Sequence, residues 1–184
     1  MWCRLMRKGR TARSPSQPNG RNSVARFLGR FLAAWLLGIL ILSLLPAIEA
    51  GAVRGTVANL GAILGLLPGE MRVTPPVIQV LNRVSIEIVP DCTPLLPVLA
   101  LWAAIAAFPS SFGWKAVGAI GGAMVLWIFN LVRLLALIPL LIWAPSLYSF
   151  SHLVLLQAVG LLVVCGCYVL WIRLQKGWSS IALD

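Results

Sequence analysis

Four long apolar stretches alternate with shorter polar segments along the 184 residues. These stretches cover about 31–48, 92–110, 116–143 and 153–172, and charged residues are nearly absent from them. An α-helix needs roughly 20 apolar residues to cross the ~30 Å hydrocarbon core of a bilayer. The pattern therefore predicts an all-α polytopic membrane protein with about four transmembrane helices, forming one transmembrane domain over residues 31–184.

The segment 49–91, between the first two predicted spans, shows two other patterns. Apolar residues recur at helical spacing over 51–67, which predicts a helix that lies in the outer membrane interface and ends at Pro68. Further on, apolar and polar residues alternate, and Asn82-Arg83 suits a turn. The alternation predicts a small β-hairpin within 77–89, with its apolar side formed by Val84, Ile86 and Ile88.

Composition and charge strengthen the membrane interpretation. The chain is 60% hydrophobic and only 11% charged, with mean hydropathy +0.92, whereas soluble proteins carry about 25% charged residues. Eight of the fifteen basic residues lie in residues 1–30, which predicts a disordered basic cytoplasmic tail rather than a nucleic-acid-binding surface. By the positive-inside rule, we expect both termini in the cytoplasm and 49–91 on the outer side of the plasma membrane.

The first apolar stretch has an alternative interpretation as the core of a cleaved signal peptide. Ala47 and Ala50 supply small residues of the kind that precede a cleavage site. A signal-peptide core usually has 7–15 residues, so the length of 31–48 favours an uncleaved span.

A candidate site emerges from three residues that the topology places at one depth. Cys92 opens the second predicted span from the outer side, and His152 directly precedes the fourth. Arg133 lies 18 residues beyond Lys115, or about 27 Å along a helix. Asn130 lies on the same helix face, one turn deeper. An arginine within a membrane segment costs roughly 2.5–3.5 kcal/mol, which points to a functional reason for Arg133.

A thiol, a guanidinium and an imidazole at one level suggest a nucleophile site. Arg133 can stabilise a thiolate at Cys92 or the oxyanion of a tetrahedral intermediate. His152 can take and return a proton near neutral pH. Asn130 can orient the guanidinium or donate to the oxyanion, and Asp91 suits a structural or substrate-contact role.

The same residues carry a family resemblance. The order of three sequence motifs resembles that of the exosortase/archaeosortase family. The motifs are DCTP around Cys92, FNLVRLLAL around Arg133 and SFSHLVLLQAVG around His152. These are membrane-embedded cysteine transpeptidases, and the resemblance covers roughly residues 73–173. It implies that Cys92 is the nucleophile, Arg133 the oxyanion stabiliser or thiolate partner and His152 the acid/base. Thr93 follows the cysteine where many members have serine.

The resemblance also implies the partners. The expected substrates are exported proteins with a C-terminal sorting signal that comprises a short motif, a transmembrane helix and a basic end. The expected reaction is cleavage at the outer face through a cysteine thioester, then transfer to an acceptor such as a lipid or a glycan. We expect no cofactor, and a single histidine without an acidic cluster argues against metal catalysis.

Two other functions stay open. A membrane thiol–disulfide oxidoreductase is suggested by Cys165-Gly-Cys167. Side chains two positions apart on a helix, however, point about 200° apart around its axis. A non-enzymatic assembly or transport subunit could use Arg133 as an ion-pair anchor, but the predicted spans contain no acidic residue to pair with it.

Overall fold

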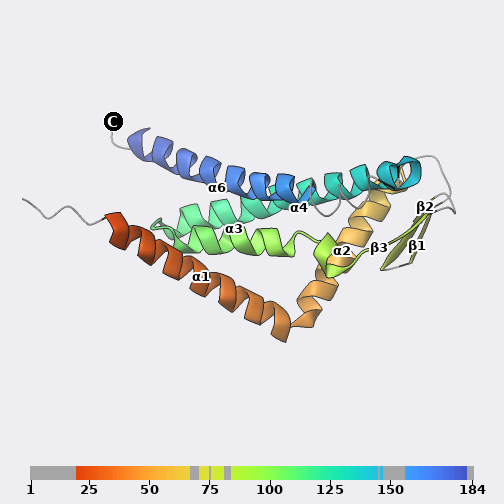
Figure 1. Cartoon of the computed structure of the whole chain (residues 1–184). Coiled ribbons are helices and arrows are strands. Elements are labelled where there is room, and N and C mark those ends of the chain that lie inside the picture. The colour runs from red at the N-terminus through yellow and green to blue at the C-terminus, as the bar shows by residue number, and fades with distance from the viewer. Residues whose placement is uncertain are drawn as a thin grey trace, which may run out of the picture.

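The computed structural model describes residues 20–66, 71–74, 76–80, 84–144, 146 and 156–181. This part of the chain is mostly helical, with one small sheet (Figure 1). The helices are α1 (Gly20–Leu44), α2 (Pro46–Leu64), α3 (Leu95–Ala107), α4 (Phe112–Trp143) and α6 (Leu156–Ile181). The strands are β1 (Met71–Thr74), β2 (Val77–Val80) and β3 (Val84–Glu87), and the short 3-10 helix η1 covers Pro90–Cys92.

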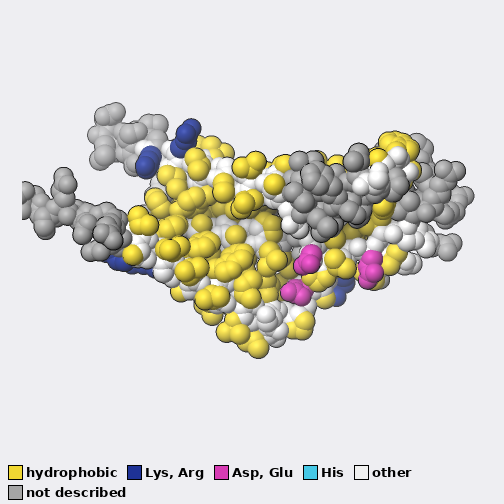
Figure 2. All heavy atoms as spheres, viewed as in Figure 1, with side chains coloured by type: hydrophobic (Ala, Val, Ile, Leu, Met, Phe, Trp, Pro, Cys, Tyr) yellow, Lys and Arg dark blue, Asp and Glu magenta, His cyan; other side chains and the backbone are white. Residues whose placement is uncertain are grey.

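Among the described residues, three helices are long and apolar enough to cross a membrane, namely 23–44, 112–143 and 156–176. Their apolar side chains are largely exposed, and yellow side chains cover much of the face in Figure 2. The stretch predicted as a fourth span, 92–110, contains an apolar helix that is shorter than these three. That stretch holds only the 13-residue α3, about 20 Å long, because Cys92 to Pro94 form a turn and α3 ends before Pro109.

The short helix α3 packs against three others, α1, α4 and α6, and so forms the centre of the helical layer (Figure 1). Glycines permit these close approaches. A Cβ built on Gly122 would lie 2.3 Å from Leu101 of α3, and one built on Gly118 would lie 2.5 Å from the Trp171 ring of α6. In Figure 1, the start of α1 and the end of α6 lie at the same end of the molecule.

Two predicted boundaries need correction. Residues 20–30 belong to α1 rather than to a disordered tail, and residues 1–19 lie outside the described part. Arginines do not prevent a helix, and Phe27, Phe31 and Trp35 stack along one side of this one. The helix ends at Leu44, not at residue 48, because Pro46 restricts the preceding residue and itself starts α2.

The helix predicted over 51–67 is present as α2, which starts earlier, at Pro46. The apolar residues that recur at helical spacing, Val57, Leu60 and Leu64, are buried within the protein, in a cluster with residues of the sheet and of α4. Thr56, next to Val57, is fully buried, and its Oγ1 has no hydrogen-bond partner in the described part of the chain.

The predicted hairpin is confirmed, because β2 and β3 pair antiparallel with Ile78 opposite Ile86. The sequence did not indicate β1, which pairs with β2 and completes a three-stranded sheet in the order β1-β2-β3. Ile78 and Ile88 are buried against the apolar face of α2, whereas Glu87 is exposed. The sheet and α2 thus form one apolar cluster beside η1.

Candidate functional site

The turn that carries Cys92 is fixed by its own hydrogen bonds. The Cys92 amide donates to the Val89 carbonyl at 2.9 Å, and the Thr93 amide donates to the Pro90 carbonyl at 2.9 Å. The Thr93 hydroxyl donates to the same Pro90 oxygen at 2.6 Å. Thr93 has extended backbone angles, φ −97° and ψ 160°, as expected for a residue before a proline. Cys92 therefore sits in a well-defined turn just before α3.

Asn130 connects this turn to α4. Its Nδ2 donates to the Cys92 carbonyl oxygen at 2.8 Å, across 38 residues of sequence. The Asn130 side chain is only 4% exposed, so the bond is shielded from competing water. Because Arg133 lies one turn further along α4, this bond places the cysteine turn beside the helix that carries the intramembrane arginine.

The Cys92 side chain itself is 8% exposed and belongs to an apolar cluster. The cluster includes Val57 and Leu60 of α2 and Leu134 and Leu137 of α4. The thiol is free. The structure thus brings Asn130 to the backbone of Cys92, while the cysteine sulfur packs among apolar side chains.

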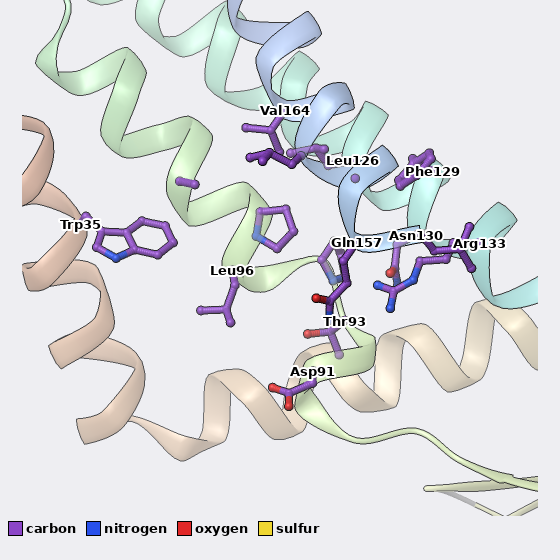
Figure 3. Close-up of a pocket in the computed structure, with 16 residues that line it drawn as sticks. Trp35, Asp91, Thr93, Leu96, Leu126, Phe129, Asn130, Arg133, Gln157 and Val164 are labelled. Atoms are coloured by element: carbon purple, nitrogen blue, oxygen red, sulfur yellow. The ribbon is translucent and has the colours of Figure 1, made fainter. Parts of the chain in front are cut away.

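A cavity of about 460 Å³ lies on the other side of this turn. The residues flanking the cysteine, Asp91 and Thr93, contribute to its lining, together with Asn130 and Arg133 of α4. The rest of the lining is mostly apolar and comes from α1, α3, α4 and α6, with Trp35 on the α1 side. Figure 3 shows the polar side chains gathered at one end of this space and the apolar ones along the remainder.

The guanidinium of Arg133 points toward the polar end of the cavity (Figure 3). Its Nε is buried and has no hydrogen-bond partner among the described residues. A cation in a low-dielectric site attracts an anion or a developing negative charge more strongly than one in water. Arg133 therefore brings a positive charge to the polar end of the cavity.

Gln157 is a cavity residue that the sequence reasoning missed. It lies in the first turn of α6 and extends toward Thr93 and Asn130 (Figure 3). The sequence feature that could have indicated Gln157 is a polar amide side chain near the start of an apolar stretch. His152, the predicted acid/base, lies outside the described residues, so its role stays a prediction.

The cysteines of the alternative redox site lie apart from this cavity. Cys165 is exposed on α6, and Cys167 packs against the apolar cluster that contains Trp171. Both are free thiols. The two side chains therefore face different surroundings, as their spacing on a helix predicted.

Taken together, the turn, the amide and the guanidinium can hold a carbonyl oxygen or an anion beside Cys92 at the end of an apolar cavity. Among the described residues, no group of three or more His, Cys, Asp and Glu side chains could hold a metal ion. Comparison of the chain with protein-family models, with curated proteins and with solved structures found no match.

Proposed function

We propose that the chain is a multi-pass membrane cysteine peptidase or transpeptidase that cleaves the C-terminal sorting signal of exported proteins. One observation carries the proposal: Asn130 holds the Cys92 turn against the helix of Arg133, at the polar end of an apolar cavity. A peptide bond at the end of a transmembrane helix fits such a site, because its helix is apolar and its carbonyl needs a donor.

In the proposed reaction, the Cys92 thiolate attacks the scissile carbonyl carbon and Arg133 donates to the oxyanion. The C–N bond then breaks, a thioester forms, and the leaving amine takes a proton from His152. A hydroxyl, amine or water next attacks the thioester carbon and passes its proton to His152. The C–S bond breaks, which restores the Cys92 thiolate and the protonated imidazole. His152 precedes the cavity residue Leu156 by four positions, an extended length of at most about 14 Å.

The proposal requires the sulfur to turn from the apolar cluster toward the cavity. Rotation about the Cα–Cβ bond supplies this movement, because Asp91 and Thr93 on either side of Cys92 already line the cavity. Binding of the substrate peptide at Arg133 and Asn130 would favour the rotated conformer. The resting thiol is thereby protected from side reactions, and Thr93 keeps the turn in place through its bond to Pro90.

The proposed orientation follows from the distribution of charge. Basic side chains gather where α1 begins and α6 ends, while acidic ones lie toward α2 and the sheet (Figure 2). By the positive-inside rule, the first end faces the cytoplasm and both termini lie there. The cavity, α2 and the sheet then lie at the outer face of the plasma membrane, with α2 in the interface.

The test is mass spectrometry of C-terminally trimmed surface proteins in cells that carry wild-type chain, Cys92→Ala, or a Cys3/Cys165/Cys167 triple Ala variant. We expect trimming in the triple variant and its loss in Cys92→Ala. Hydroxylamine should release a product trapped as a thioester, whereas a reductant should not. Loss of trimming in the triple variant alone, or release by reductant alone, would assign the chemistry to the α6 cysteines instead.

One observation favours the non-enzymatic alternative, an assembly subunit. The Cys92 side chain is buried in the apolar cluster of α2 and α4, where it also serves as a packing residue. If packing is its whole role, Cys92→Ala and Cys92→Val should differ in stability, and neither should change the trimming of surface proteins. An enzyme loses trimming with both.

A further inference from the structure

A second hollow borders the chain segment that leads into the Cys92 turn. It is a groove of about 530 Å³ between the first half of α2, residues 46–54, and the chain segment 87–90 that leads into the turn. Pro90 lines the groove, and the next residue, Asp91, lines the cavity. The turn that carries Cys92 is therefore the partition between the two hollows.

One wall of the groove includes the end of an edge strand. In the described sheet, β3 pairs with β2 on one side only. The Ile88 amide donates to the Pro76 carbonyl on the β2 side, at 3.0 Å. Because backbone groups alternate between the two edges of a strand, the N–H and C=O of Ser85 and Glu87 point to the free edge. The Glu87 backbone thus offers a donor and an acceptor at the groove.

The groove also carries unpaired charge. Glu49 and Arg54 on α2 and Glu87 on β3 all line it. In the described structure no ion pair joins these three side chains, and their charges add up to a net charge of minus one. A basic side chain in the groove would therefore be preferred over an acidic one.

We infer that this groove binds an extended polypeptide segment of the substrate, the part that directly precedes the scissile bond. The segment pairs its backbone with the free edge of β3, as in β-augmentation, and a basic side chain faces the carboxylates. A chain that runs from the groove into the cavity must cross the Cys92 turn. The inference rests on the proposed function only for the statement that this peptide is the substrate.

The test places a photo-crosslinking residue in the full chain, in nanodiscs, with Cys92→Ala to prevent turnover. Ala50 lies in the groove, and Ala62, exposed further along the same helix, is the matched control. The probe is a set of model polypeptides with a randomised segment of about eight residues, an apolar helix of about 20 residues and an Arg-rich end. We expect cross-linking at least about fivefold stronger from position 50 than from position 62. Mass spectrometry should map it to the randomised segment.

Two variants of one residue separate backbone pairing from charge. Glu87→Pro removes the outward N–H yet leaves the bonds to β2, since proline is tolerated on edge strands. Glu87→Ala keeps the N–H and removes the carboxylate. We expect Glu87→Pro to abolish the cross-link. Glu87→Ala should retain it and lower the preference of Lys-containing over Glu-containing probes, which we expect to be about two- to fivefold in the parent chain.

Equal cross-linking from positions 50 and 62, a cross-link to lipid, or one that maps to the apolar helix would overturn the inference. Its failure is distinguishable from that of the proposed function, because the cross-link does not need catalysis. A groove-specific cross-link in the Cys92→Ala chain, with no hydroxylamine-sensitive thioester in the chain that keeps Cys92, would refute the peptidase and keep the binding site. A thioester in the chain that keeps Cys92, together with equal cross-linking from positions 50 and 62, would support the peptidase and refute the groove as a binding site.

Discussion

The hydrogen bond from Asn130 to the Cys92 carbonyl gives the sharpest prediction. Asn130→Ala removes the donor at 2.8 Å and leaves a shielded carbonyl without a partner. An unsatisfied buried polar group costs about 1–3 kcal/mol. Since 1.4 kcal/mol corresponds to a factor of ten, the equilibrium for release of the turn should shift by about 5- to 150-fold.

The assay is the rate at which a maleimide labels Cys92, in a chain whose other cysteines are replaced by serine. The thiol is 8% exposed, so labelling requires either rotation of the side chain into the cavity, which leaves the turn in place, or release of the turn. Labelling through release of the turn should rise by the same factor. Asn59→Ala is the control, because Asn59 is exposed on α2. Asn130→Asp, which puts an acceptor against the carbonyl, should raise labelling at least as much. Equal rates for wild type, Asn59→Ala and Asn130→Ala would refute the role of this bond.

The remaining predictions concern packing and the guanidinium. Gly118→Ala should cost about 1–3 kcal/mol in unfolding free energy, because its Cβ would lie 2.5 Å from the rigid Trp171 ring. Gly121→Ala has open space and should be neutral or stabilising, by up to about 1 kcal/mol. Trp102→Phe should cost about 0.5–1.5 kcal/mol through loss of the 2.9 Å bond to the Ala119 carbonyl. Thermal unfolding in detergent tests all three. Arg133→Lys should lower surface-protein trimming roughly tenfold or more, because a point charge replaces the planar fork, and wild-type trimming would remove the oxyanion role.

The parts of the fold that depend on periodicity could be predicted from the sequence. The α2 face of Val57, Leu60 and Leu64 and the alternation around Ile86 are both visible as spacing, and both are found. The strand β1, Met71–Thr74, alternates apolar and polar residues over only four positions, a run too short to predict a strand by itself, so its pairing depends on β2. Such a strand is specified by its partner and not by its own sequence.

The candidate site could be predicted in part. The depth argument brought Cys92 near Asn130 and Arg133, and the structure places the cysteine backbone against Asn130. The direction of the sulfur could not be predicted, because it depends on side chains from α2 that pack around it. Gln157 escaped notice because a lone amide in an apolar stretch carries no pattern.

The length of α3 was mispredicted for a reason that itself explains the site. From Ala107 to Leu95 the helix rises about 18 Å, at ~1.5 Å per residue, and the three steps back to Cys92, of which only Thr93 has extended backbone angles, add at most about 10 Å. Asn130 lies 18 residues after Phe112, or about 27 Å along α4. The height of Cys92 above the start of the α3–α4 pair therefore agrees with the height of Asn130 along α4. The extended Thr93 compensates for an α3 that is too short to reach the level of Asn130.

That compensation depends on Pro94, because a residue before proline is kept out of the helical region. Pro94→Ala should let α3 extend through Thr93, and each residue converted from strand to helix lowers Cys92 by about 2 Å. A 2.8 Å hydrogen bond does not survive such a shift, so we expect maleimide labelling of Cys92 to rise about as much as in Asn130→Ala. Pro97→Ala is the matched control. Pro97 lies inside the first turn of α3, where backbone N–H groups have no partner within the helix, so its replacement should leave the start of α3 unchanged. If Pro97→Ala raises labelling as much as Pro94→Ala, general loosening of α3 explains the effect, and the height argument fails.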